Sequence, residues 1–311
     1  YYTRIILLLI TYSFLLLLCR NGILKKFWFY NNRFILLQTI LSLVGFILAT
    51  AGVLKPLITV IPSESFHVYR FYGILCSKIG YSGDSNFFRP SGYFDDPGAL
   101  ATWVIFGLVI NRSFIRDSLY SKLVPWFTIV TMSIAYYVQL ALFLMLKNVT
   151  TLYKLVPIVL CVYIAIPYIN STEGSNFDIY SKTLGRLESD SEKGIAGNNR
   201  QIQMDNASRI FYRSPIFGVG SKNWVNQGEQ VSDNPYEVLS KDGIVGYIIT
   251  YLPLLFILMT NQKREIFCGL IVIFVGYQQR PFHFNFLQDL YLWSFLLFAL
   301  LDKEQNYKKI T

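Results

Sequence analysis

The sequence is poor in charged residues. Only 15% of its 311 residues are Asp, Glu, Lys or Arg, whereas 53% are hydrophobic and 17% are aromatic. Soluble globular domains carry about 25% charged residues. The low charge content, together with a mean hydropathy of +0.39, therefore indicates an integral membrane protein.

Cysteine and histidine are also scarce, with four and two copies respectively. Cys19, Cys161 and Cys268 lie within apolar runs and Cys76 stands alone in a polar segment, so no disulfide framework is indicated. The sequence has no Cys/His metal spacing, no Walker loop and no G-x-S-x-G elbow. We therefore expect no metal, no cofactor and no Ser-His catalytic site.

Long apolar runs are abundant. A helix needs about 17 to 25 apolar residues to cross a bilayer, and about eight segments reach or approach that length. We therefore predict an all-α, polytopic membrane protein. Full-length candidates are residues 34–54, 126–146, 152–169 and 244–260, and shorter ones are residues 5–19, 98–110, 266–277 and 286–301. Because the chain starts at an apolar run without Met, we expect N-terminal residues to be missing.

Lys and Arg gather in short loops, which marks the cytoplasmic side of a membrane protein. The clusters lie near residues 20–33, 112–122, 147–154, 263–264 and 303–309. This topology accounts for the net charge of +9, so we expect no nucleic-acid partner.

The same topology places two long polar segments outside. We expect three regions: 1–169, with membrane helices and an external loop at 55–97; 170–243, a large, mostly helical external loop; and 244–311, with membrane helices and a cytoplasmic tail. Aromatic residues throughout the large loop predict an ordered lobe rather than a disordered one.

The segment 126–146 has basic loops on both sides, although a single crossing would separate them. We therefore predict that it is broken or re-entrant, with a turn near Thr131, Met132 and Ser133. Irregular backbone is tolerated at membrane depth where protein covers it. The alternative is a straight span, with Lys147 and Lys154 reaching back from an external hairpin.

An Arg, a Gly and an Asp-Pro pair precede one of the predicted helices, in "FFRPSGYFDDPGAL". Asp96 is placed to cap this helix and Pro97 to occupy its first position. Capping alone is one interpretation of Asp96. The other is that the helix start and Arg89 bind an anion such as a diphosphate.

A second polar stretch, "GNNRQIQMDNASRIFYRSPIFGVG", predicts a helix over residues 200–212. Arg200 lies at its start, whereas Arg209 and Arg213 share another face. An ion pair with Asp205, four residues earlier, explains Arg209 as well as ligand binding does, so Arg200 is the stronger candidate.

The helix is followed by Pro215, Gly218 and Gly220. The two glycines predict a tight turn, and close backbone approach at a functional site is the second interpretation.

Together these segments resemble the O-antigen polymerase and O-antigen ligase superfamily. The family's motifs are Arg then Gly-x-Phe-x-x-Pro, an Arg-containing helix ending in Pro-x-x-Gly-x-Gly, and His-Asn-x-x-Leu with Gly-x-x-Gly. The corresponding stretches here are "RPSGYFDDPGALA", "NNRQIQMDNASRIFYRSPIFGVG" and "DNPYEVLSKDGIVGYIITYLPLL". The predicted break near Ser133 is similar to the family's Thr-x-Ser turn.

The resemblance implies a metal-independent glycosyltransferase of the bacterial inner membrane, with its site on the external face. Such an enzyme moves a glycan from an undecaprenyl diphosphate carrier to the acceptor sugar of a lipid-linked repeat unit. Its partners would be these repeat units, the bilayer and a chain-length regulator.

Individual residues carry over from the family's motifs. Arg89 and Arg200 match its functional arginines, and Arg280 in "QQRPFHF" is a third candidate. Asp233 stands where ligases have His, which favours a polymerase over a ligase, and Asn234 beside it is a further substrate-binding candidate. The chemistry asks for a base at the acceptor hydroxyl, and Asp233 is the candidate; its other interpretation is a cap on the helix that follows.

Two other classes of protein stay open. A ligase would transfer the glycan to a different acceptor. A multi-pass transporter or flippase of lipid-linked sugars would place charged or helix-breaking residues inside paired spans, often as internal repeats, and no repeat is visible in this sequence. A non-enzymatic scaffold would leave the order of the motifs unexplained.

Overall fold

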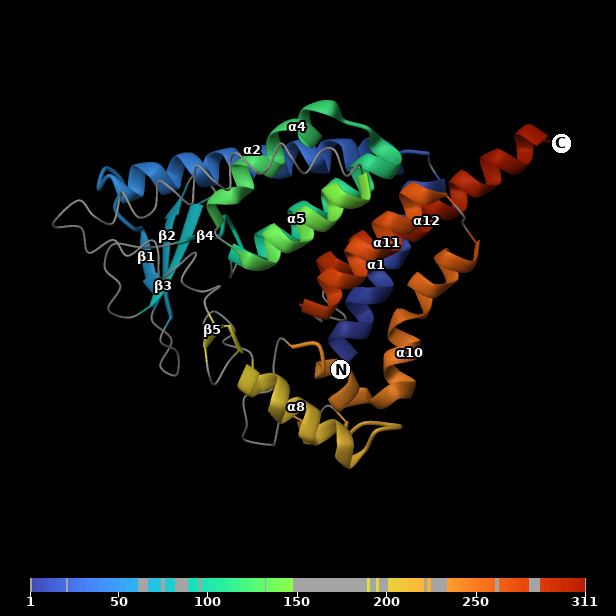
Figure 1. Cartoon of the computed structure of the whole chain (residues 1–311). Helices are drawn as coiled ribbons and strands as arrows, with labels where there is room; N and C mark the ends of the chain where they lie inside the picture. Colours follow the sequence, from blue (N-terminus) through green and yellow to red (C-terminus); the bar gives the residue numbers. More distant parts are fainter. Residues whose placement is uncertain are drawn as a thin grey trace. The chain divides into compact units, whose positions relative to one another are not determined.

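The computed structural model describes residues 2–20, 22–60, 67–73, 76–81, 89–94, 97–131, 133–147, 189–190, 194–195, 201–220, 223–224, 234–260, 263–279 and 286–310. The chain divides into two compact units, each of which is described by itself. Unit 1 comprises Tyr1–Lys25 and Ser189–Thr311, and unit 2 comprises Lys26–Glu188. Figure 1 labels most of their helices and strands. The three predicted regions were defined by the side of the membrane on which each segment lies. The two units are defined by packing within the chain, so their boundaries differ from those of the regions.

Helices account for most of the described part of unit 2. The innermost is α3 (Pro97–Ile110), whose residues are all buried because it is apolar on every side. It packs against both α4 and α5. The other helical elements are α2 (Leu24–Thr50), a π-helical turn (Asn111–Ile115), α4 (Ser118–Thr128), a 3-10 turn (Ile129–Thr131) and α5 (Ile134–Lys147).

Helix α2 begins at Leu24, whereas the sequence predicted a loop up to residue 34. Lys25, Lys26 and Arg33 therefore lie on the helix and not in a loop, which corrects the prediction. Lys and Arg are good helix formers. Their long side chains can also follow the helix surface while the charged group reaches water, so a basic segment can extend an apolar helix.

The predicted all-α architecture is also corrected, because part of the segment 55–97 forms an antiparallel sheet. Its strands are β1 (Ile58–Val60), β2 (His67–Gly73), β3 (Cys76–Tyr81) and β4 (Arg89–Pro90), in the order β1-β2-β3-β4. Val, Tyr and Phe along β2 favour extended backbone. These strands are short and their pattern is interrupted by polar residues, so the sequence suggested only a loop.

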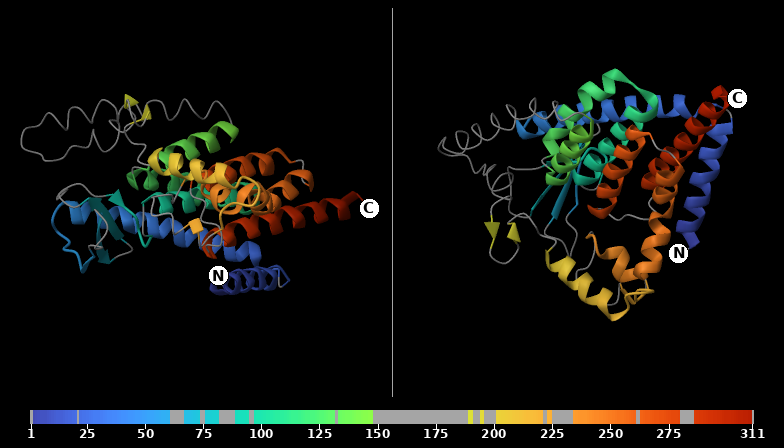
Figure 2. Two further views of the ribbon diagram at one scale, coloured as in Figure 1. Left: turned by 90° about the horizontal axis from the view of Figure 1, so that it is seen from below. Right: turned by 45° about the vertical axis from the view of Figure 1, so that its right-hand side comes forward.

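Unit 1 consists mainly of α1 (Tyr2–Arg20), α8 (Gln201–Arg213), α10 (Glu237–Thr260), α11 (Arg264–Gln279) and α12 (Phe286–Ile310). Two short strands, β5 (Ser189–Asp190) and β6 (Gly194–Ile195), pair with each other. Helices α1 and α12 lie side by side (Figure 2), and the Tyr12 and Trp293 rings meet edge to face at 5.5 Å. Helix α10 packs against α8, α11 and α12, and Tyr251 contacts Phe274 at 5.3 Å between ring centroids.

Three helices in the described part of the chain are long and apolar enough to cross a membrane: Leu24–Ala49, Pro97–Ile115 and Glu237–Met259. Shorter apolar helices cover Leu9–Arg20, Ala135–Leu146 and Asp289–Leu301. The protein is therefore mostly helical, with candidate membrane-spanning helices. The predicted total of about eight membrane segments stays a prediction, and one of them, 152–169, lies outside the described residues.

The predicted break near Ser133 is confirmed. Helix α4 ends at Thr128, the 3-10 turn ends at Thr131, and α5 starts at Ile134. The Tyr136 hydroxyl donates to the Pro125 carbonyl at 2.7 Å, so the first turn of α5 lies beside the last turn of α4. One straight helix over 126–146 is excluded, whereas the side of the membrane on which Lys147 and Lys154 lie stays a prediction.

Candidate functional site

The backbone of Arg89 is fixed at the edge of the sheet in unit 2. Strand β4 pairs with β3, so that Arg89 lies opposite Ile79. Just beyond β4, the Ser91 N–H donates to the Ser77 carbonyl at 2.9 Å. The first motif thus starts from an anchored strand, and not from a free loop.

Gly92 brings this segment against α2. Its φ of 61° is a conformation that L side chains rarely adopt. A Cβ at this position would lie 2.7 Å from Gln38 Nε2, too close for an undisturbed contact. A glycine is therefore needed here both for its backbone conformation and for its small size.

Buried hydroxyls hold the other side of the same segment. Ser77 and Ser91 are 2% and 0% exposed, and their hydroxyls are hydrogen-bonded to each other. The Ser77 hydroxyl also donates to the Gly92 carbonyl. With Ser91 as donor to Ser77, each hydroxyl hydrogen is used once. Phe94 then stacks on Trp103 of α3 at 5.7 Å, so the sheet, α2 and α3 together position the motif.

Pro97 is the first residue of α3, as predicted. The first turn of α3 is buried. Its amides therefore do not form an open surface, and a diphosphate ligand would have to meet Arg89 rather than the helix start alone. Asp96, the predicted cap, lies outside the described residues.

In unit 1, the helix predicted over residues 200–212 is confirmed as α8, Gln201–Arg213. Its buried face carries Ala207 and Ile210, which are 0% and 1% exposed. Arg209 and Arg213 are both exposed and lie four residues apart, on one side of the helix as their spacing predicted. Arg209 donates a hydrogen bond to the Asn206 side chain, whereas its ion pair with Asp205 stays a prediction.

The glycines of the turn after α8 have the backbone conformation that a tight turn requires. Gly218 and Gly220 have φ values of 70° and 78°. A Cβ on Gly218 would lie 2.3 Å from the Lys241 carbonyl oxygen. Conversely, a Cβ on Gly243 would lie 2.3 Å from the Ile216 carbonyl oxygen. The close approach is therefore between this turn and α10.

Helix α10 is interrupted at the same place. Gly243 has φ 67° and ψ −171°, which no α-helix contains, so helical hydrogen bonding stops there. The turn after α8 bonds to the polar groups on either side. On one side of Gly243, the Val219 N–H donates to the Ser240 carbonyl at 3.1 Å and the Gly220 N–H to the Lys241 carbonyl at 2.9 Å. On the other side, the Ile244 N–H donates to the Pro215 carbonyl at 2.9 Å and the Val245 N–H to the Ile216 carbonyl at 3.1 Å. We call residues 215–220 and 240–245 the glycine clamp.

Trp224 fastens α8 to the glycine clamp. Its indole N–H donates to the Ser240 hydroxyl at 2.9 Å. Its ring packs with Ile210 and Val219, and the Lys241 ammonium lies 6.0 Å from the ring centre. No local pattern of residues singles out Trp224, because its partners are distant along the chain.

Asn234 begins the turn that leads into α10. It is fully buried, and its Oδ1 accepts from the Tyr236 N–H at 2.8 Å. Asn234 thus caps the turn that leads into this helix. Asp233 lies outside the described residues, so its roles as base or as cap stay predictions. Asn234, predicted to contact substrate, has a structural role at this helix start.

The predicted site residues fall in both units. Arg89 belongs to unit 2, whereas Arg209 and Asn234 belong to unit 1. Arg200 and Arg280, like Asp96 and Asp233, lie outside the described residues. Arg200 directly precedes α8, Asp233 precedes Asn234, and Arg280 follows the end of α11. Because α8 packs against α10, the elements that flank Arg200 and Asp233 belong to one packed assembly.

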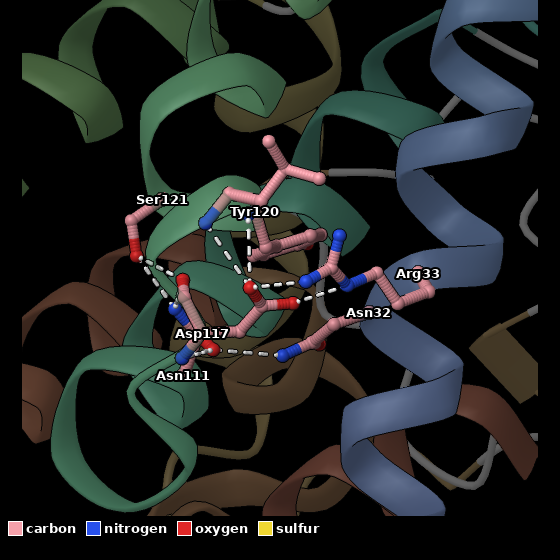
Figure 3. Close-up of polar contacts among 7 residues, drawn as sticks. Asn32, Arg33, Asn111, Asp117, Tyr120 and Ser121 are labelled. Carbon is pink, nitrogen blue, oxygen red and sulfur yellow. Dashed lines mark hydrogen bonds and ion pairs between the residues drawn. The ribbon is translucent and has the colours of Figure 1, made fainter.

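Unit 2 also contains a polar cluster that the sequence did not reveal (Figure 3). Asp117, whose side chain is 2% exposed, receives both Arg33 Nε at 2.8 Å and Arg33 Nη2 at 3.0 Å. The same carboxylate accepts from the Leu119 N–H at 3.1 Å and caps α4. The sequence placed Arg33 and Asp117 in two separate cytoplasmic loops, and the structure joins those segments.

Asn111 completes the cluster. Its Oδ1 accepts from Asn32 Nδ2 at 3.1 Å and from the Asp117 N–H at 3.0 Å. Its Nδ2 donates to the Asp117 carbonyl at 2.9 Å and to the Ser121 hydroxyl at 2.6 Å. These contacts are internal, so we assign the cluster to holding α2 against the α3–α4 connection.

Comparisons with protein-family models, with curated proteins and with solved structures found no match to this chain.

Proposed function

We propose that the protein is a polysaccharide polymerase of the bacterial inner membrane. It transfers a glycan from an undecaprenyl diphosphate carrier to the acceptor sugar of a second lipid-linked repeat unit, on the external face. The proposal starts from the order of the motifs in the sequence. The candidate membrane helices are compatible with it.

The observation that carries the proposal is the packing of the two glycine motifs. Gly92 lies against Gln38 of α2, and Gly218 lies against the interrupted α10. Each motif is thus a rigid turn built onto a candidate membrane helix. Rigid turns at such helices suit a site that must hold a lipid-linked substrate in a fixed geometry.

The proposed reaction is a direct displacement. The acceptor hydroxyl oxygen attacks the anomeric carbon, the bond from that carbon to the diphosphate oxygen breaks, and the diphosphate leaves with the electron pair. Asp233 takes the hydroxyl proton. Arg89 and Arg200 bind the leaving diphosphate, because a guanidinium pairs two phosphate oxygens at once. Arg280 and Arg209 supply further positive charge.

The test is polymer formation by Arg89→Lys, Arg200→Lys and Asp233→Asn variants, at matched membrane levels in a host lacking the native gene. Losing a paired charge at the diphosphate should cost about 2 to 4 kcal/mol of transition-state stabilisation, which is roughly a 30- to 1000-fold loss of rate. Arg264→Lys is the matched control, since Arg264 is exposed at the start of α11. Normal polymer from both site Lys variants would refute the assignment of the arginines.

The length of the surface glycan separates a polymerase from a ligase. Deleting a polymerase leaves chains of one repeat unit on the final acceptor. Deleting a ligase leaves long polymer on its lipid carrier. The second result would transfer the proposal to the ligase reaction.

A transporter of lipid-linked sugars is the second candidate, because α2 carries a buried polar stripe. Asn32, Gln38, Thr39 and Ser42 are all at most 3% exposed. Polar residues inside membrane helices often line a transport path. Proteoliposomes that move the lipid-linked repeat unit across the bilayer without lengthening it would favour this function over polymerisation.

A further inference from the structure

Three apolar side chains are exposed where α8 ends. Tyr212, Ile216 and Phe217 are 74%, 57% and 73% exposed. Single exposed apolar residues are ordinary on protein surfaces, but a group of this kind marks an interaction surface. We call these three residues the apolar turn.

The glycine clamp sets the level of the apolar turn along α10. The Ile244 N–H donates to the Pro215 carbonyl at 2.9 Å, and the Val245 N–H donates to the Ile216 carbonyl at 3.1 Å. Ile216 therefore lies beside the first turn of α10 after Gly243. Phe217 follows it directly.

That first turn is where the exposed apolar flank of α10 begins. From Ile244 to Thr260 the helix rises about 26 Å, close to the roughly 30 Å thickness of a hydrocarbon core. The flank is exposed along most of this length and follows the helical period. Its members are Ile244, Val245, Ile248, Ile249, Leu252, Leu255 and Phe256.

We propose that the apolar turn is an interfacial anchor, which inserts between the lipid headgroups and the hydrocarbon of the membrane that α10 crosses. Aromatic side chains favour this level of a bilayer. Helix α8 runs crosswise at the foot of α10, so its C-terminal end brings the turn to that level (Figures 1 and 2). Arg213, next to Tyr212, adds positive charge beside anionic lipid. The inference rests on the proposed membrane location and is independent of glycan transfer.

The occupant is lipid rather than another protein because the apolar turn is continuous with a helix flank of membrane length. The clamp joins the two surfaces by backbone hydrogen bonds, so they move together. If lipid covers the flank from Ile244 onward, the same lipid layer reaches Ile216 and Phe217.

The test measures contact with lipid at three positions. The native cysteines are replaced by Ser, and Phe217→Cys, Ile249→Cys and Asp205→Cys are each labelled with an environment-sensitive fluorophore. Position 249 reports the span, and position 205 is the control on the exposed face of α8, farther from the clamp. The proteins are placed in nanodiscs of phosphatidylcholine and phosphatidylglycerol, with spin-labelled lipids as quenchers.

The expected result is strong quenching at 249 by acyl-chain labels, strong quenching at 217 by labels near the headgroup, and little quenching at 205. Quenching at 249 alone would overturn the anchor and leave the membrane span intact. Absence of quenching at both 249 and 217 would overturn the membrane location as well. Equal quenching at 205 and 217 would also overturn the anchor, because the turn would not be the inserted part. Ile216→Cys repeats the measurement should Phe217→Cys fold poorly.

Discussion

Gly218 and Gly243 each hold a left-handed backbone conformation while facing the other's chain. A positive φ and the lack of space for a Cβ are two separate reasons for a glycine. At one position in the protein only the first reason applies. Gly220 has a φ of 78°, but a Cβ there would meet nothing within 4 Å. The three glycines can therefore separate backbone strain from steric exclusion.

Gly218→Ala and Gly243→Ala should destabilise the protein more than Gly220→Ala. The left-handed conformation alone costs a non-glycine residue about 1 to 2 kcal/mol, and the added Cβ at 218 or 243 must also push backbone atoms apart. The measurement is the thermal midpoint of the detergent-solubilised protein by fluorescence-detected gel filtration. Equal midpoints for all three variants would show that the clamp is not closely packed.

Gly92→Ala should also destabilise the protein, but this defect should be partly reversible. The added Cβ would meet the end of the Gln38 side chain, which Gln38→Ala removes. We expect the double variant to melt above Gly92→Ala, with only the strain of the positive φ remaining. Gly52→Ala, which has a φ of 76° and open space, is the control. No rescue in the double variant would place the steric conflict elsewhere.

Single residues show how far the sequence could predict this site. The tight turn at Gly218 followed from glycine spacing, because a turn depends on neighbouring residues. Its packing against Gly243 could not be predicted, since the partner is remote and ordinary spacing rules do not reach it. The hydrogen bond from the Tyr236 N–H to Asn234 was not predicted either, because the sequence pointed to Asp233 as the possible cap.

At the scale of elements, the pair between Arg33 and Asp117 ties α2 to the start of α4. Arg33 reaches the surface, with 37% of its side chain exposed, whereas Asp117 is buried. Removing the arginine would leave a buried carboxylate without its cation. The remaining capping bonds from the Leu119 and Tyr120 N–H groups compensate only in part.

Arg33→Gln should therefore lower stability by about 2 kcal/mol, below the 3 to 5 kcal/mol of a fully buried pair because solvent screens the exposed arginine. Arg112→Gln is the matched control; Arg112 lies over the Phe143 ring at 5.5 Å. The measurement is the thermal midpoint of each variant, and that of Arg33→Gln should be the lower. A midpoint for Arg33→Gln no lower than that of the control would mean that the pair contributes no net stability.

Elements also differed in how well the sequence predicted them. The break before Ser133 was predicted from the basic residues in the loops on both sides of the segment, because a single crossing would have separated those loops. The extension of α2 back to Leu24 was missed because basic residues were taken to mark a loop. The sheet was missed because its strands are short and pair across connections that no local pattern specifies.

For the whole molecule, the decisive property is which side of the membrane each end of a helix faces. Lys263 and Asn223 are both exposed, near opposite ends of α10 and its clamp. In a background without native cysteines, Lys263→Cys should react with a membrane-impermeant maleimide only in inverted vesicles. Asn223→Cys should react in intact cells. The reverse pattern would turn the protein over and put the proposed site inside the cell.

The interruption of α10 has a consequence for how the chain assembles. Its unpaired backbone groups near Gly243 would resist transfer into lipid until another segment satisfied them. The segment that does so precedes α10 along the chain, so it leaves the ribosome first. Correct insertion of this span should then depend on earlier translocation of α8 and its turn, which makes biogenesis of the C-terminal helices a sequential process and not an independent one.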